Sequence, residues 1–364
     1  MKQIFTTIQK EANKILLFTV LAGAMASCDS ILDFEEGDCS IEYRVKFKYD
    51  YNMAANGKGV NTFSEEVRTV TLYAFDNDGN FVYQKTEGGE PLTDGNYSML
   101  IDIEPVDYQL IAWAGLDDQS FAVPLLGAES KIEDLTVLTL RNKDSQTRTK
   151  DEEGKYIVKD KLSDLWHGKV TRQSFTRSGR QNTVTVPLVK NTNTIRVVIA
   201  QVNTTPSRPV TRAIHKDRFS YALYDDNGWM NYDNTLLEDN LLTYLPFITE
   251  DTSIKTRALS QDNTESEYSA AVAEISVARL LESQRPMLRI TDTDTGKELL
   301  PSESLIGYLS LLKQQDKINM PLQEYLDREN QFSMIFFVDE SLTLLQTKLQ
   351  INDWIINYEN IELK

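Results

Sequence analysis

A cysteine placed directly after a short apolar run carries the clearest chemistry in this chain of 364 residues. The run spans residues 15–26, three lysines precede it, and the small residues Ala26 and Ser27 lead into Cys28. Its 12 residues are too few for a membrane-spanning helix, which needs ~20, but they suit the apolar part of a cleaved secretory signal. In bacterial lipoproteins the thiolate of a cysteine at this position is alkylated with diacylglycerol, and cleavage makes that cysteine the first residue. We therefore predict that residues 1–27 are a lipoprotein signal peptide and that Cys28 carries the lipid; ordinary secretion with Cys28 unmodified is the alternative.

The role of the second cysteine, Cys39, depends on whether Cys28 is lipidated. With only two cysteines, the chain has no disulfide framework that could replace an apolar core. If Cys28 is acylated, Cys39 has no partner within the chain. If Cys28 is free, a Cys28–Cys39 bridge closing a short loop can form in an oxidising compartment.

The other residue types that catalyse reactions form no recognisable motif. The two histidines, His167 and His215, lie far apart in the sequence without metal-ligand spacing, and we expect His167 to be structural or solvent-facing. The chain contains no Gly-x-Ser-x-Gly elbow, phosphate-binding glycine loop or Cys-x-x-Cys pair. The sequence does not exclude a glycosidase with a catalytic pair of carboxylates. The 55 acidic residues of an acidic surface, however, produce close carboxylate pairs without any catalytic role. We predict that the chain is not an enzyme and needs no cofactor.

A carboxylate-rich segment at residues 76–80 (DNDGN) resembles the start of a calcium-binding EF-hand loop, and Glu87 falls at the twelfth position. Phe81, however, stands where that loop requires glycine, and both flanks have the pattern of strands. Asp-Gly supplies the positive φ angles that a tight hairpin needs. We predict a hairpin turn here and no metal site.

The net charge excludes one large class of partner. The chain carries a formal charge of −17, and loss of residues 1–27, with three lysines and one glutamate, makes it more acidic still. Such a surface repels phosphate backbones, so we expect no nucleic-acid partner. A hydrophobic content of 41% is ample for folded cores.

Alternating apolar and polar residues predict a mainly β protein. Residues 43–49 alternate with period two, and residues 67–84 hold two β-rich runs around the DNDGN turn. We expect further strands at residues 97–103, 109–114, 135–140 and 183–189. Strand follows strand without long amphipathic helices, which favours antiparallel β-sandwiches over a parallel α/β sheet.

An internal similarity predicts two related domains. YAFDNDGNFVY at residues 73–83 has a counterpart in YALYDDNGWMNY at residues 221–232, about one domain length later. We therefore expect an acidic tether at residues 28–40 and two β-sandwich domains at residues 41–190 and 191–364.

Two loops and two short helices complete the prediction. Residues 141–182 and 249–268 are polar, and we expect long loops there, the first around a packed segment at residues 162–166. In the second domain, Pro301-Ser302-Glu303 precedes leucines and an isoleucine at helical spacing, and Pro321 precedes another short stretch. Both stretches are expected to be short helices that pack against a sheet.

The C-terminal segment, residues 349–363, has two sets of apolar residues of opposite parity. Leu349, Ile351 and Ile355 form one set, and Trp354, Ile356 and Tyr358 form the other. The polar pair at residues 352–353 separates them, so either a bulge redirects the chain or the strand is buried on both faces. This segment is the last strand of its own domain or a strand that completes the sheet of another subunit by edge addition.

The order of these motifs resembles a known family. The segments that carry the resemblance are the lipoprotein signal, YRVKFKYDYNM, VRTVTLYAFDNDGNFV, YQLIAWAGL, LWHGKV, TVTVPLVKNTNTIRVVI, PLQEYLDRENQFSMIFFVD and INDWIINYENIEL. Together they are similar to the fimbrial anchor lipoproteins of Bacteroidales, which include the anchors of the major and minor fimbriae. The similarity spans essentially the whole mature chain.

The resemblance implies two tandem transthyretin-like β-sandwiches and a place at the base of a donor-strand-type (type V) pilus. It also implies a lipid anchor in the outer membrane, attachment of the fimbria and a limit on its length. In related shaft pilins, loss of an N-terminal strand empties a groove in the first domain, and this groove accepts a strand of another subunit. An anchor that keeps Cys28 cannot lose its N-terminus, so we expect the corresponding groove to stay closed. The expected partner is the fimbrial shaft pilin. The expected contact residues are Leu349, Ile351, Trp354, Ile356 and Tyr358.

The alternative function is a surface lipoprotein that binds glycan or a host ligand. The four tryptophans could then form stacking platforms for sugars; they are Trp113, Trp166, Trp229 and Trp354. Trp113 and Trp354 lie in strong strand patterns, for which burial in a core is the simpler expectation. Exposed tryptophans on one rim would favour glycan binding, and buried ones with an available terminal strand would favour anchoring.

Overall fold

A computed structural model describes the greater part of the chain. The described residues are 41–54, 59–143, 155–177, 181–202, 214–256, 266–300, 304–315, 319–351 and 354–356. The predicted signal peptide, Cys28, Cys39 and the predicted tether lie outside them. Tyr43–Thr176 and Asn182–Lys364 form one compact unit.

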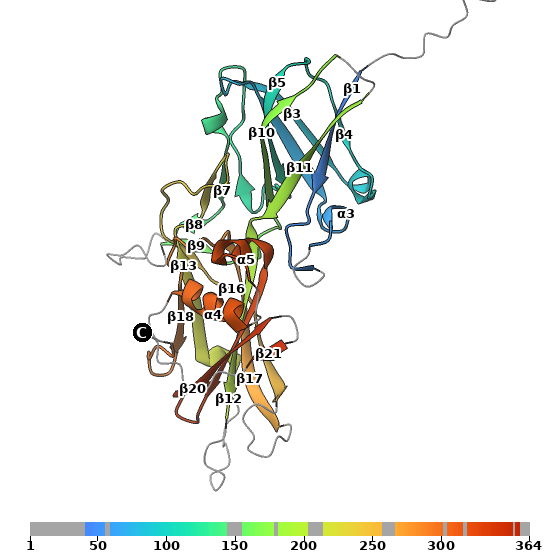
Figure 1. The fold of residues 1–364 in the computed structure, drawn as a ribbon. Helices are drawn as coiled ribbons and strands as arrows, with labels where there is room; N and C mark the ends of the chain where they lie inside the picture. The colour runs from blue at the N-terminus through green and yellow to red at the C-terminus, as the bar shows by residue number, and fades with distance from the viewer. Residues whose placement is uncertain are drawn as a thin grey trace, which may run out of the picture. The chain divides into compact units, whose positions relative to one another are not determined.

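The mainly β prediction is confirmed (Figure 1). A seven-stranded sheet has the order β3-β2-β5-β10-β11-β1-β4. Its strands are β1 (Glu42–Lys48), β2 (Thr69–Phe75), β3 (Phe81–Gly88), β4 (Met99–Ile101), β5 (Asp107–Ala114), β10 (Trp166–Ser174) and β11 (Gln181–Lys190). A one-turn helix α3 (Phe63–Glu66) and a 3-10 turn η1 (Glu90–Thr93) connect strands of this sheet.

The hairpin predicted at residues 67–84 forms as β2 and β3, paired antiparallel with Tyr73 opposite Gln84. The Asp76 carboxylate accepts hydrogen bonds from the backbone nitrogens of Asp78 and Asn80, and Gly79 adopts a φ of 77°. The carboxylate is used to close the turn, as an Asx-type turn requires.

The expectation of long loops across residues 141–182 is wrong for the strand β10. Its nine residues lie inside the seven-stranded sheet, paired antiparallel with β5 on one side and β11 on the other. The segment WHGKVTRQS has a weak apolar alternation because its second half is exposed, and the strand is maintained by neighbours distant in sequence. Two short strands also lie in this region, β8 (Asn142–Lys143) and β9 (Tyr156–Val158).

A six-stranded sheet has the order β16-β17-β12-β19-β20-β21. Its strands are β12 (Thr192–Gln201), β16 (Pro246–Thr256), β17 (Ser266–Ala278), β19 (Gln331–Val338), β20 (Leu344–Ile351) and β21 (Trp354–Ile356). The loop expected at residues 249–268 is shorter than predicted, because β16 continues to Thr256 and β17 starts at Ser266.

Two smaller sheets contain strands from both sides of the predicted boundary at residue 190. One has the order β18-β13-β15-β9-β8 and the other β14-β7-β6. Besides β8 and β9, these two sheets contain β6 (Phe121–Ala122), β7 (Thr136–Thr139), β13 (Phe219–Asp225), β14 (Trp229–Asn231), β15 (Leu242–Tyr244) and β18 (Met287–Asp292). The 3-10 turns η2 (Ile132–Asp134) and η3 (Lys216–Arg218) precede β7 and β13. The pairings of β9 with β15 and of β12 with β19 are parallel.

The two similar motifs take different partners in the structure. Residues 73–83 form the β2–β3 hairpin, whereas β13 and β14 pair with other strands. β13 lies between β15 and β18, and β14 pairs with β7. The sequence similarity therefore extends to strand positions but not to strand pairing.

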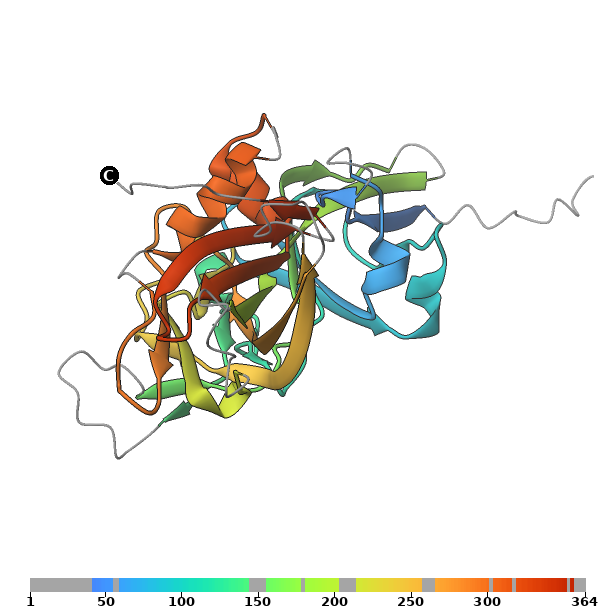
Figure 2. The ribbon, with the colours of Figure 1, turned by 90° about the horizontal axis from the view of Figure 1, so that it is seen from below.

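The two predicted helices are α4 (Leu305–Gln315) and α5 (Leu322–Arg328), and Pro321 is the N-cap of α5. Both helices pack on the six-stranded sheet, on the side that faces β13, β15 and β18 across a shared core (Figure 2). Tyr308 of α4 contacts Phe336 edge-on, with ring centroids 6.0 Å apart, and Tyr325 of α5 contacts Phe332 in the same way. Aromatic edge contacts of this kind hold the helices to the strand that precedes the C-terminal hairpin.

Candidate functional site at the C-terminal edge and the chain junction

The structure brings together four of the five predicted contact residues. Leu349 lies opposite Ile356, and Ile351 lies opposite Trp354, in the antiparallel pairing of β20 with β21. Tyr358 lies outside the described residues, as does the pair at 352–353 where a bulge was considered. In this structure the C-terminal strands pair within their own chain.

The C-terminal hairpin occupies one edge of the six-stranded sheet. Within the described residues, β21 pairs with β20 only, and it ends the strand order. An edge strand offers unpaired backbone N–H and C=O groups to another strand. The three described residues of β21 offer such a site for strand addition.

The strand β19 fixes the position of this hairpin. β19 pairs in parallel with β12 and antiparallel with β20, with Met334 opposite Leu349. Phe332, Met334 and Phe336 of β19 are fully buried in the shared core. The hairpin is thus attached to one of the most buried strands of the protein.

At the other end of the chain, the first strand is held inside its sheet. β1 lies between β11 and β4, and Tyr43 and Val45 stand opposite Ile101 and Met99 of β4. Phe47 stacks on Phe63 at 5.7 Å. The alternating side chains predicted to face the core are buried, which confirms the half-buried strand expected at residues 43–49.

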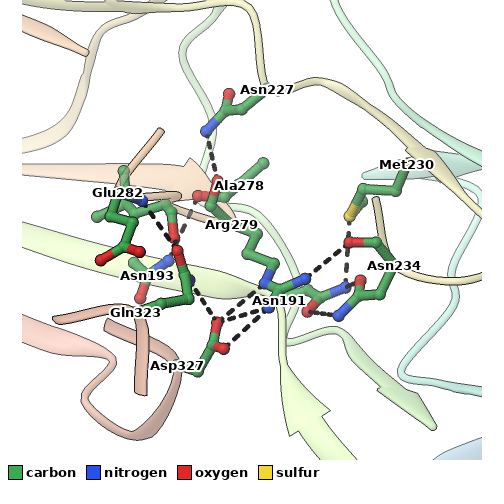
Figure 3. A network of polar contacts seen from close by, with 11 residues as sticks. Asn191, Asn193, Asn227, Met230, Asn234, Ala278, Arg279, Glu282, Gln323 and Asp327 are labelled. Carbon is green, nitrogen blue, oxygen red and sulfur yellow. Dashed lines mark hydrogen bonds and ion pairs between the residues drawn. The ribbon is translucent and has the colours of Figure 1, made fainter. Parts of the chain in front are cut away.

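A largely buried ion pair joins Arg279, the residue that follows β17, to Asp327 of α5 (Figure 3). The guanidinium of Arg279 donates to both carboxylate oxygens of Asp327 at 2.8–3.0 Å, and its third nitrogen donates to the Asn234 carbonyl at 2.7 Å. Gln323 donates to Asp327 and to the Leu280 carbonyl. Nearly all hydrogen-bonding groups of the pair are therefore used, which is what makes a buried ion pair tolerable.

Two asparagine side chains extend this network to the chain junction. Asn191 and Asn234 each donate from the side-chain amide to the other's oxygen, at 2.5 and 3.2 Å (Figure 3). Asn234 has a φ of 69°, a conformation that asparagine tolerates better than most residues. The Asn191 backbone nitrogen donates to the Leu165 carbonyl at 2.6 Å. The network connects the start of β12 to residues 162–167, which the sequence placed in the other domain.

No sequence pattern predicts this network. Asn191 lies at the predicted domain boundary, whereas Arg279 and Asp327 have no spacing in the sequence that relates them. The available signal was an asparagine within a turn, Asn234, whose short polar side chain suits a positive φ. Long-range ion pairs of this kind depend on the tertiary fold.

The buried histidine does not have the environment of a catalyst. His167 packs edge-on against Trp113, and its Nε2 bonds to the Tyr232 carbonyl oxygen at 2.8 Å. Burial lowers the pKa of His167 from 6.5 to about 4, so the imidazole is neutral at neutral pH. Its structural role, expected from the sequence, agrees with this burial.

A second buried group, Asp225, ends strand β13. Burial and, to a lesser extent, the neighbouring Asp226 raise the pKa of the Asp225 carboxyl from 3.8 to about 7. The carboxyl accepts one hydrogen bond, from the Asp226 backbone nitrogen at 3.1 Å. Within the part of the chain that the structure describes, no cluster of His, Cys, Asp and Glu could hold a metal ion.

The chain matches the model of one known protein family over most of its length. The model of the fimbrillin-A associated anchor proteins, Mfa1 and Mfa2, matches residues 35–360. The chain belongs to this family of anchor proteins. Family membership associates the chain with fimbriae at the cell surface and with the shaft proteins that such anchors accompany.

Solved structures agree with the family and the fold. A candidate adhesin from Bacteroides thetaiotaomicron has 31% sequence identity and a TM-score of 0.69, with coverage of 86% of this chain and 97% of that chain. A second protein from that organism, described as a candidate polysaccharide-binding protein, has 28% identity and a TM-score of 0.69, covering 88% and 99%. The fimbrial anchor protein Mfa2 from Porphyromonas gingivalis shares the fold at 17% identity, with a TM-score of 0.57 and coverage of 87% and 99%. The search of curated proteins gave no match.

No helix among the described residues is both long and apolar enough to cross a membrane.

Proposed function

We propose that this protein is a non-enzymatic outer-membrane lipoprotein that anchors a type V fimbria and limits its length. A diacylglycerol on Cys28 holds one end of the chain in the membrane, and the C-terminal region joins the shaft pilin by β-strand complementation. Within this proposal, residues 41–190 and 191–364 are two transthyretin-like domains that connect the two attachments. Membership in the anchor family supports the role as a fimbrial anchor, and the position of the C-terminal hairpin supports strand complementation with the shaft pilin.

The single observation that supports this attachment to the shaft is the position of β20 and β21 at the end of the strand order, where β21 pairs only with β20 among the described residues. Strand addition there makes a row of backbone hydrogen bonds, and alternate side chains add specificity. β20 is paired with the buried strand β19, so load applied to the hairpin passes into the core of the protein.

The arrangement of the first strand supports permanent rather than exchangeable attachment at the N-terminal end. β1 is paired on both sides by strands of its own chain. Another subunit's strand would have to displace it and its buried side chains. We infer that the first groove does not accept a shaft strand and that polymerisation stops at this subunit.

Two variants in cells test the proposal. Cys28→Ala should release the protein, together with fimbriae, into the medium. Deletion of residues 354–364 removes β21 but retains β20, so the lipoprotein should stay on the cells while fimbriae are shed. Protease shaving of intact cells and immunoblots of cells and medium measure both outcomes.

The structure provides a matched control for the deletion. Ile248→Ala alters an exposed residue near the opposite edge of the same sheet and should leave fimbriae attached. Cell-attached fimbriae of normal length in the deletion strain would rule out the proposed joint. Unchanged membrane attachment of Cys28→Ala would rule out the lipid.

Glycan binding, the alternative function, loses part of its expected support. Trp113 and Trp166 are buried in cores and cannot stack on a sugar, and the side chain of Trp354 lies outside the description. Trp229 is the one of the four with a described, exposed side chain.

A further inference from the structure

A cavity of about 620 Å³ opens beside Trp229, on the solvent-facing side of the sheet β14-β7-β6. Ala122, Leu138 and Trp229 stand opposite one another across the three strands and form one apolar row. The next residues along the strands, Val137 and Met230, are buried in the core on the other side. Trp229 is 37% exposed, so part of its ring is available to a ligand.

A buried ion pair forms the polar part of the cavity lining. Nη1 of Arg141 donates to the two carboxylate oxygens of Asp239 at 2.7 and 2.6 Å, and the two side chains are only 10% and 4% exposed. Arg141 Nε donates to the Thr139 carbonyl at 2.9 Å, which fixes the plane of the guanidinium. Asn240, which is exposed, adds an amide at the rim. The cavity thus combines an aromatic surface with planar polar groups that are already oriented.

We propose that this cavity binds a neutral saccharide unit. A pyranose ring has an apolar C–H face that can stack on Trp229 and hydroxyls at its rim that can reach the exposed amide of Asn240. Small-ligand sites are cavities of ~300–1,000 Å³ with mostly apolar walls and a few convergent polar groups, and this cavity has that composition. The proposal adds a ligand to the anchor and does not depend on the lipid or on the C-terminal joint.

The polar lining argues against an apolar peptide side chain as the occupant. Such a side chain would remove water from the exposed amide of Asn240 without replacing its hydrogen bonds, which is unfavourable. Charge argues against an anionic sugar, because the cation in the cavity is already neutralised by Asp239 and the whole chain carries −17. A neutral polyhydroxylated ring matches both halves of the lining.

An array of immobilised neutral and sialylated oligosaccharides, probed with the full chain in detergent, tests the proposal. Binding should be confined to neutral saccharides, and titration of the strongest one gives the dissociation constant. Trp229→Ala should weaken binding about tenfold by removing the stacking surface, and Asn240→Ala should weaken it less. Trp229→Phe keeps an aromatic face and should retain most of the affinity.

Ile248→Ala is the matched control, since it removes an exposed apolar side chain (43% exposed) outside the cavity and should leave affinity unchanged. Thermal unfolding of each variant establishes that it is folded. Binding to no neutral saccharide, binding to sialylated ones only, or equal affinity of Trp229→Ala and the wild type would each overturn the proposal.

Discussion

At the scale of single residues, two buried titratable groups give the protein opposing responses to pH. His167 has a folded pKa of about 4, below its usual 6.5, so its contribution to stability is present above pH 6.5 and is lost as the pH falls towards 4. Asp225 has a folded pKa of about 7, above its usual 3.8, so its contribution is present below pH 4 and is lost as the pH rises towards 7. Each effect is at most on the order of 3–4 kcal/mol, and the two largely cancel between pH 4 and 6.5.

Asp225→Asn should separate these effects. The amide has the shape of the carboxyl but carries no charge, so at pH 8 the variant should be about 1–3 kcal/mol more stable than the wild type. On acidification to pH 5 this advantage should disappear, and the variant should lose stability because only the His167 effect remains. Denaturant unfolding between pH 5 and pH 8 measures both trends.

Asp118→Asn is the control for this series, because Asp118 is exposed and is not among the charges that act on His167 or Asp225. It should show the same pH dependence as the wild type. Parallel curves for Asp225→Asn and the wild type would contradict the burial argument.

At the scale of elements, the strand β10 shows how sheet neighbours override a weak local pattern. Gly168 lies in β10 between Ala112 of β5 and Leu188 of β11. A Cβ atom at Gly168 would lie 2.5 Å from the Pro187 carbonyl oxygen and 2.6 Å from Val186 Cγ1. The absence of a side chain allows β11 to approach, which is a common reason for glycine within a strand.

Gly168→Ala should therefore destabilise the protein by about 1–3 kcal/mol, because both contacts must shift. Gly127→Ala is the matched control, since a Cβ at Gly127 meets nothing within 4 Å. Its effect on the free energy of unfolding should be close to zero or slightly stabilising. Urea unfolding of the two variants gives the comparison, and equal midpoints would contradict the close approach of β11.

At the scale of the whole molecule, strand pairs and one continuous core cross the predicted boundary at residue 190. β7 pairs with β14, and β9 pairs with β15. The core cluster contains residues from both sides, including Trp113 and Phe336. The division into two domains stays a prediction, but these links make separate unfolding of the two halves unfavourable.

Calorimetry should accordingly show a single unfolding transition for the whole chain. Arg279→Gln breaks the buried pair with Asp327 and should move that transition as a unit, with a loss of about 3–5 kcal/mol. Arg172→Gln removes a surface pair whose arginine is 78% exposed and should change stability by less than about 1 kcal/mol. Two resolved transitions, of which Arg279→Gln moves only one, would show that the halves unfold separately.

The sequence by itself determined the local features of this protein. The alternation in residues 43–49, the Asp76–Gly79 turn and the helix after Pro321 depend on residues a few positions apart, so period and turn chemistry sufficed. The family resemblance likewise followed from the order of motifs along the chain. Tertiary structure decided the features that depend on distant residues: the strand β10, the pairing of β14 with β7, and the Arg279–Asp327 pair. It also decided which tryptophans are buried and which one faces a cavity. Such features arise from contacts between segments 40 to 100 or more residues apart, and no local pattern encodes which segments will meet.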